Sequence, residues 1–261
     1  MNEDQIKKDY SKKLKLFIKY NKFYYDKSAP MVSDQKFDLL KKEILDLEKK
    51  YPNLINNNSP SENVGFKPSK IFKKVNHKSP MLSLGNAFTE EDLENFEKKI
   101  LNYLNQKNDF EIEYSAEPKI DGISASLIYI DGKFQAGLSR GDGKQGEDIT
   151  ANLKTISDIP KKILDKDFPN EIDIRGEVFI QNSDFKSLKD KFANPRNAAS
   201  GSLRQKNPEE TKKIPLKFIA YTYGFEKGLK VKNQKDFLSK LKKWGFKTNS
   251  LNITTNGIKN L

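Results

Sequence analysis

The first third of the chain repeats apolar residues with the period of an amphipathic helix. One apolar stripe predicts a helix over residues 3–25, which Ser28-Ala-Pro30 ends. A second stripe predicts a helix over residues 34–50, capped by Ser33 and ended by Tyr51-Pro52. The first stripe consists of Leu14, Phe17 and Ile18, and the second of Phe37, Leu40, Ile44 and Leu47. Together these helices predict a small N-terminal module.

The helical periodicity then gives way to residues that are typical of linkers. Asn56-Asn-Asn-Ser-Pro60 and Phe66-Lys-Pro68 are rich in turn-forming residues. We therefore place a domain boundary near residue 73, which separates a helical module over residues 1–73 from a second domain over residues 74–261.

The second domain contains both segments with helical periodicity and segments with the two-residue period of a strand. Thr89 is placed to cap a helix that runs to about Asn105, with three acidic residues in its first turn. Two β-periodic segments flank Asp131-Gly132, which predicts a hairpin with a two-residue turn. The other expected elements are strands at Ile123–Ile130, Lys133–Ser139, Ile172–Ile180 and Lys217–Phe225, a helix or turn opening at Pro195, and a helix at Lys235–Trp244 ended by Gly245. The fold class is therefore α+β.

Composition narrows the class of protein. The 261 residues are only 35% hydrophobic and 32% charged, yet Phe and Tyr are plentiful, which indicates a soluble globular protein. No apolar run is long enough to span a bilayer, and the N-terminus lacks the apolar core of a signal peptide. The chain has no cysteine, which excludes disulfides and thiolate zinc sites within it. We expect a cytoplasmic protein.

The charge is strongly positive, at +12. An anionic partner such as nucleic acid would explain this charge, and so would a bias towards Lys, Asn and Ile from AT-rich coding. The arginines are more informative, because a chain that uses Lys almost everywhere retains Arg mainly where a planar, forked donor is needed. The four arginines are Arg140, Arg175, Arg196 and Arg204.

The segment Ala116–Leu127 is unusual for a strand. Read with a period of two, it places Glu117, Lys119 and Asp121 on one face, beside a glycine. A lysine that loses its proton is a nucleophile, but neighbouring carboxylates raise the pKa of a lysine. The acids are therefore better explained as ligands for sugar hydroxyls, a base edge or a metal ion. A salt-bridged strand end with an Asp-Gly turn is the alternative, which the short motif alone favours.

Three further segments carry similar chemistry. Residues 139–150 hold three glycines and Arg140, which predicts either an anion-binding loop or a flexible surface loop. Asp173, Arg175 and Glu177 alternate along a strand, so we expect them on one face of a polar cleft. Residues 192–205 combine two arginines with small residues, as in a phosphate site or in close packing with ion pairs.

Taken together, these motifs resemble the adenylation domain of NAD-dependent bacterial DNA ligases. The matching segments are Glu117–Gly122, Arg140–Gly143, Gly146–Thr150, Arg175–Phe179, Ala193–Ala199 and the preceding His77–Leu84. Tyr24-Tyr25, Ala29-Pro30, Asp34 and Phe37-Asp38 resemble the helical module with which these ligases bind nicotinamide mononucleotide. The resemblance implies a nucleotidyltransferase (ATP-grasp-like) domain of antiparallel sheets with flanking helices.

The resemblance also implies a role for each motif residue. Lys119 would attack the adenylyl phosphorus of NAD to form lysyl-AMP, with Asp121 and Glu177 serving the nucleotide and the metal-assisted chemistry. Glu117, Ser83 and Leu84 would form the adenine pocket. Arg140 would contact ribose or phosphate, and Arg196 and Arg204 would hold the phosphate of AMP or of the nick. The residues expected to bind the nicotinamide mononucleotide half of NAD are Tyr24, Tyr25, Asp34 and Asp38.

The resemblance implies NAD as the AMP donor, Mg²⁺ as a cofactor and nicked duplex DNA as the partner, in replication and repair near the bacterial nucleoid. Ser28 stands where the family usually has Asp. The chain also ends before the family's two later lysine strands and its DNA-encircling modules, so we expect a fragment or truncated product that cannot seal nicks alone. A non-catalytic NAD- or DNA-binding remnant, or half of a split ligase with a second chain, is the alternative. An ATP-dependent RNA ligase or capping enzyme is disfavoured by the residues at 24–38.

Overall fold

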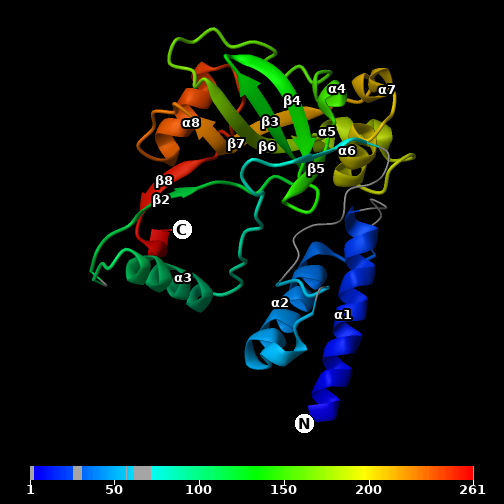
Figure 1. Ribbon diagram of the computed structural model, residues 1–261, viewed down its shortest axis with the longest axis vertical. Coiled ribbons are helices and arrows are strands. Elements are labelled where there is room, and N and C mark those ends of the chain that lie inside the picture. Colours follow the sequence, from blue (N-terminus) through cyan, green and yellow to red (C-terminus); the bar gives the residue numbers. More distant parts are fainter. Residues whose placement is uncertain (1–2, 26–30, 57, 62–71, 108, 261) are drawn as a thin grey trace.

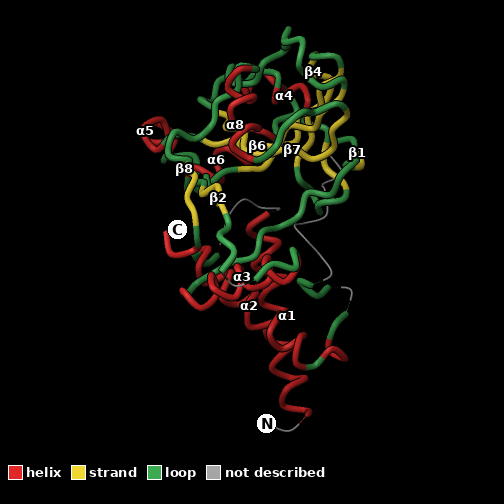
Figure 2. The backbone as a smooth tube through the Cα atoms, turned by 90° about the vertical axis from the view of Figure 1, so that its left-hand side faces the viewer, coloured by secondary structure: helices red, strands yellow, loops and turns green. Residues whose placement is uncertain are grey.

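The computed structural model describes residues 3–25, 31–56, 58–61, 72–107 and 109–260. Two N-terminal helices stand apart from a larger part built of helices and antiparallel strands (Figure 1). In Figure 2 the strands gather in the part of the molecule away from the N-terminus, and α1 and α2 project below them. No helix in the described ranges combines the length and the apolar character that crossing a membrane requires.

The N-terminal helices follow the predicted pattern closely. They are α1 (Glu3–Tyr25) and α2 (Asp34–Lys50), followed by the short 3-10 helix η1 (Pro52–Leu54). Ser33 caps α2, because its side chain accepts a hydrogen bond from the amide of Lys36 at 3.3 Å. The predicted segment at residues 28–30 lies outside the described residues.

A separate apolar cluster holds the two helices together, formed by Tyr10, Leu14, Phe17, Phe37 and Ile44. The prediction for Ile18 is wrong, since its side chain is 42% exposed, and Tyr10 takes the place in the core instead. The Tyr10 hydroxyl donates to Glu48 Oε1 at 2.7 Å, which satisfies a polar group inside the cluster.

The centre of the larger part is a four-stranded antiparallel sheet in the order β4-β3-β6-β7. Its strands are β3 (Ile123–Ile130), β4 (Lys133–Ser139), β6 (Glu171–Phe179) and β7 (Lys217–Lys227). The predicted hairpin is confirmed, because Asp131 and Gly132 adopt positive φ angles of 49° and 71° between β3 and β4.

Further helices complete the larger part of the chain. They are α3 (Glu90–Tyr103), α4 (Thr150–Leu153), α5 (Asn182–Phe185), η2 (Lys186–Leu188), α6 (Pro195–Leu203), α7 (Pro208–Lys212), α8 (Gln234–Lys243) and η3 (Ile258–Asn260). Of these, α4, α6 and α8 contact the strands of the main sheet and bury its apolar side. Thr89 and Asp92 form the reciprocal capping box of α3, as the acidic first turn indicates. Gly245, at φ 90°, follows the end of α8 as predicted.

Two short ribbons lie beside the main sheet and were not predicted. One pairs β1 (Lys74–Asn76) with β5 (Gln145–Glu147), and the other pairs β2 (Glu113–Ala116) with β8 (Ile253–Asn256). A strand of three or four residues is too short for its alternation of side chains to be recognised in the sequence.

Candidate active site

Lys119 lies in the link between two sheets. β2 ends at Ala116 and β3 begins at Ile123, so the expectation that Glu117, Lys119 and Asp121 share a strand face is wrong. The chain has to cross from the β2–β8 ribbon to the main sheet, and Pro118 has no amide N–H for a strand ladder. The crossing leaves Lys119 exposed to solvent.

Glu117 anchors the start of this link. Its Oε1 accepts hydrogen bonds from Ser115 Oγ at 3.2 Å and from Gln234 Nε2 at 2.7 Å, and its Oε2 accepts from Asn252 Nδ2 at 3.2 Å. These donors come from β2, from the start of α8 and from the segment before β8. The carboxylate therefore ties three parts of the fold together two residues before Lys119.

Asp121 continues the link on the other side of Lys119. Its Oδ1 accepts from Arg196 Nη1 at 2.9 Å, while its own side chain remains 60% exposed. Arg196 is only 16% exposed and extends from the first turn of α6, whose N-cap is Asn194. A firmly held guanidinium thus lies beside an accessible carboxylate.

Gly122 brings the link against β6. A Cβ at this position would lie 2.3 Å from the carbonyl oxygen of Val178 and 2.9 Å from Glu177 Cγ, which leaves room only for glycine. This close approach, three residues after Lys119, brings the link to the strand that carries Glu177.

Glu177 is the buried acid of the site, at 8% exposure. Ser124 Oγ on β3 donates to its Oε2 at 3.0 Å, and the Tyr221 hydroxyl on β7 lies 3.4 Å from the same atom. Burial raises the pKa of Glu177 to about 7, although the Ser124 hydrogen bond and three positive charges oppose the shift. The three charges belong to Arg196, Lys119 and Arg140, whose electrostatic effect therefore reaches this carboxylate.

Arg175 lies on β6 two residues before Glu177 and binds the segment that precedes Ser83. Its Nη2 lies 2.9 Å from Asp173 Oδ2, and it also donates to the carbonyl oxygens of Ser79 and Pro80 at 2.5 and 2.9 Å. The alternating charges of β6 do share one face, as predicted. Arg175 clamps the segment that leads to Ser83 onto the sheet.

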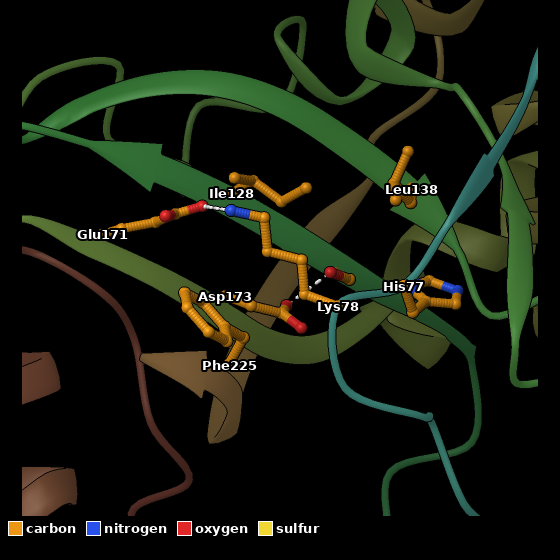
Figure 3. Close-up of a pocket in the computed structure, with 8 residues that line it drawn as sticks. His77, Lys78, Ile128, Leu138, Glu171, Asp173 and Phe225 are labelled. Atoms are coloured by element: carbon orange, nitrogen blue, oxygen red, sulfur yellow. Dashed lines mark hydrogen bonds and ion pairs between the residues drawn. The ribbon is translucent and has the colours of Figure 1, made fainter. Parts of the chain in front are cut away.

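A small cavity opens on the same sheet face beside this clamp, and Figure 3 shows the side chains that line it. Lys78 pairs there with Glu171, and Ser126 donates to Asp173. The cavity measures only about 10 Å³, which is room for about one water molecule, so it is not a nucleotide pocket.

The glycine-rich loop after β4 uses its amides internally. The amide of Asp142 donates to the carbonyl of Gln145 at 3.2 Å, and that of Gly143 donates to the carbonyl of Arg140 at 3.0 Å. Asp142 Oδ1 accepts from the amides of Lys144 and Gln145. These four amides are unavailable to an anion, so the anion-cradle interpretation is wrong for them. The loop instead holds the backbone carbonyl of Arg140, which accepts from the Gly143 amide.

The other predicted site residues have the following surroundings. Arg204 Nε pairs with Glu147 Oε2 at 3.2 Å, and that carboxylate is fully buried. Ser83 is exposed and Leu84 is 86% exposed. Asp38 is half-buried on α2. The side chains of Tyr24, Tyr25 and Asp34 lie outside the described residues.

Sequence reasoning missed four residues that build this site. They are Ser124, Tyr221, Gln234 and Asn252. Strand alternation could have placed Ser124 and Tyr221 near Glu177 once the register was known, whereas nothing in the local sequence marks Gln234 or Asn252. Nowhere in the described residues do three His, Asp or Glu side chains gather closely enough to hold a metal ion.

The raised pKa of Glu177 leads to a stability prediction. Because the folded pKa of about 7 exceeds the ordinary value of 4.5, the folded state keeps a proton that the unfolded state loses between these pH values. Stability should therefore fall as pH rises through this window, by up to about 3 kcal/mol. Thermal melting at pH 5 and pH 8 should show this loss in the wild type and not in Glu177→Gln. An equal loss in both proteins would contradict the assignment.

Comparison with known proteins agrees with this arrangement. The model of the NAD-dependent DNA ligase adenylation domain matches residues 69–261, and that of the DNA ligase-like N-terminal NAD⁺-binding domain matches residues 3–65. The DNA ligase of Pelagibacter ubique is 67% identical over 261 residues, which is 100% of this chain and 39% of the relative. That of Parvibaculum lavamentivorans is 45% identical over 241 residues, 89% of this chain and 34% of the relative. The DNA ligase of Coprothermobacter proteolyticus is 39% identical over 266 residues, which is 99% of this chain and 40% of the relative.

Proposed function

The chain belongs to the NAD-dependent DNA ligase family, and on that premise we propose that Lys119 takes the AMP group from NAD as the first step of sealing nicks in duplex DNA. The chain spans about 39% of the length of its Pelagibacter relative, so complete ligation is proposed for the whole protein. The observation that carries the proposal is that the link bearing Lys119 meets β6 at the buried Glu177, beside the Arg196–Asp121 pair, so that the charges of Lys119, Arg140 and Arg196 act on that carboxylate.

The proposed step is a nucleophilic substitution at phosphorus. The deprotonated Nζ of Lys119 attacks the adenylyl phosphorus, a P–N bond forms, and the P–O bond to nicotinamide mononucleotide breaks. The electron pair of that bond leaves with the mononucleotide phosphate, and the lysine proton passes to solvent or to a nearby base. Arg140 and Arg196 would neutralise the charge that develops on the phosphate oxygens.

The carboxylates would serve the nucleotide and its magnesium ion. Mg²⁺ is commonly bound through one or two carboxylates together with substrate phosphates, so the lack of a larger acidic cluster among the described residues is compatible with it. Asp121, which is 60% exposed, and Glu177 are the two carboxylates that fit this role. The ion would neutralise phosphate charge.

The adenine and the nicotinamide halves would lie on opposite sides of Lys119. We assign Glu117, Ser83 and Leu84 to the adenine side, where Tyr221 adds an aromatic ring. We assign Tyr24, Tyr25, Asp34 and Asp38 of the helical module, residues 1–73, to the nicotinamide mononucleotide.

The sheets of residues 74–261 would then form a nucleotidyltransferase domain. For the whole protein we propose a role in DNA replication and repair, in the cytoplasm near the nucleoid. Arg196 and Arg204 would contact phosphates of AMP or of the nick. Because each arginine is paired with a carboxylate, substrate binding would have to share or displace Asp121 and Glu147.

Incubation of the chain with NAD and Mg²⁺, followed by intact mass spectrometry, tests the proposal. We expect the mass to rise by one AMP group, with release of one equivalent of nicotinamide mononucleotide. ATP in place of NAD serves as the matched control and should give no adduct. An adduct with ATP and none with NAD would contradict the proposal.

A further inference from the structure

A second groove of about 520 Å³ lies beside the outer edge of β7, and no motif predicted it. Its volume is within the range of ligand-binding pockets. Its lining includes Phe179 at the end of β6, Lys217 at the start of β7, and Lys242, Lys247 and Thr248 at and after the end of α8.

Positive charge dominates this groove. Lys247 Nζ pairs with Asp158 Oδ1 at 2.7 Å, which neutralises one lysine. Lys217 and Lys242 form no ion pair with any side chain in the ranges that the structure describes. The next lysine in α8, Lys243, contrasts with them because its Nζ lies 2.9 Å from Asp165 Oδ2. Two ammonium groups in one groove, uncompensated by neighbouring carboxylates, favour an anionic ligand.

One lysine of the groove, Lys217, lies on the catalytic face of the sheet. Lys217 pairs in register with Phe179, and Ile219 pairs with Glu177. Residues directly opposite in an antiparallel pair point to the same side, so Lys217 lies on the face that carries Glu177. The separation is two residues along the strand, or about 7 Å. An anion bound to Lys217 would therefore lie next to the proposed adenylation site.

The groove is also held in a fixed shape. The Asp158 carboxylate that binds Lys247 also accepts a hydrogen bond from the Phe218 amide at 3.2 Å. The carbonyl of Lys247 accepts one from the amide of Ala220 at 2.9 Å. The segment after α8 is thereby attached to the edge of β7, so the lysines project from a rigid frame.

We propose that this groove binds backbone phosphates of the DNA duplex through Lys217 and Lys242, and so extends the DNA contact surface beyond the adenylation site. The inference rests on the proposed function, because it takes DNA as the substrate. Lysine is suited to the task, since phosphate contacts position a duplex without reading its sequence.

The test compares Lys217→Gln/Lys242→Gln with the control Lys161→Gln/Lys162→Gln, which removes the same charge from two exposed lysines elsewhere in the domain. Fluorescence anisotropy with a nicked duplex, across a salt series, measures affinity. We expect the groove variant to bind roughly tenfold more weakly, with a salt slope less steep by about 1 to 2, because each lost phosphate contact removes about 0.9 from the slope. The control should match the wild type.

Three results would overturn the inference: the groove variant and the control show equal affinities and slopes, the unsubstituted chain binds no duplex, or inorganic phosphate binds in a Lys217-dependent way while duplex binding is unchanged. Adduct formation with NAD is measured in parallel. If the adduct forms in every variant, failure in the binding assay counts against the groove alone. If it forms in none, including the wild type, the proposed function fails.

Discussion

Replacing Lys119 with Ala should abolish transfer of AMP from NAD to the protein. Its Nζ is the group that forms the P–N bond in the proposed step, and no neighbouring side chain of the link can substitute, because Glu117 and Asp121 are acids. Release of nicotinamide mononucleotide, followed chromatographically, should fall to the level of a sample without protein.

Lys144→Ala is the matched control for this change. Lys144 is an exposed lysine of the glycine-rich loop whose amide, not its side chain, makes the loop hydrogen bond. We expect it to release the mononucleotide at close to the wild-type rate. Equal loss in both variants, or full activity in Lys119→Ala, would show that Lys119 is not the nucleophile.

Replacing Arg175 with Met should destabilise the fold by about 3–5 kcal/mol, the usual cost of removing one partner from a buried ion pair. The Asp173 carboxylate would keep its Ser126 contact and lose the guanidinium, and the carbonyl oxygens of Ser79 and Pro80 would lose their donor. Urea unfolding followed by circular dichroism measures the change.

The double variant Asp173→Asn/Arg175→Met separates charge from packing. It removes the buried negative charge as well, so it should be more stable than Arg175→Met alone. If Arg175→Met costs less than about 1 kcal/mol, or if the double variant is the less stable of the two, the role assigned to this clamp is incorrect.

Local sequence signals predicted most of the regular elements. The α3 capping box, the Asp131-Gly132 turn and the Gly245 stop each depend on residues close in sequence, and the structure confirms them. The prediction for Ile18 failed because helical period defines a stripe and not its edges. Tertiary packing buries Tyr10 instead, and the Tyr10 hydroxyl donates a hydrogen bond to Glu48.

The candidate site was predictable in its residues more than in its geometry. Lys119 and Glu177 stood out through their motifs, yet the strand assumed around Lys119 is a link between two sheets. The β2–β8 ribbon that sets this crossing joins segments far apart in sequence. Asn252 could not be predicted for the same reason, because it donates a hydrogen bond to Glu117 from a position 135 residues away in the sequence.

The paired arginines show a similar limit. Chemistry that suits a phosphate also suits a carboxylate, so sequence alone could not show that Arg196 meets Asp121 or that Arg204 meets buried Glu147. The groove beside β7 was equally hidden, because its lysines come from a strand and from the end of a helix. Only the fold brings them together.

Peptide mapping after incubation with NAD tests the central claim most directly. Trypsin does not cleave after a modified lysine, so the AMP group should appear on a peptide spanning residues 108–133, with Lys119 as the uncleaved and modified position. AMP on that lysine, obtained from NAD and not from ATP, is the predicted result. AMP on a different lysine, or an unmodified Lys119 in a folded chain supplied with NAD and Mg²⁺, would contradict it.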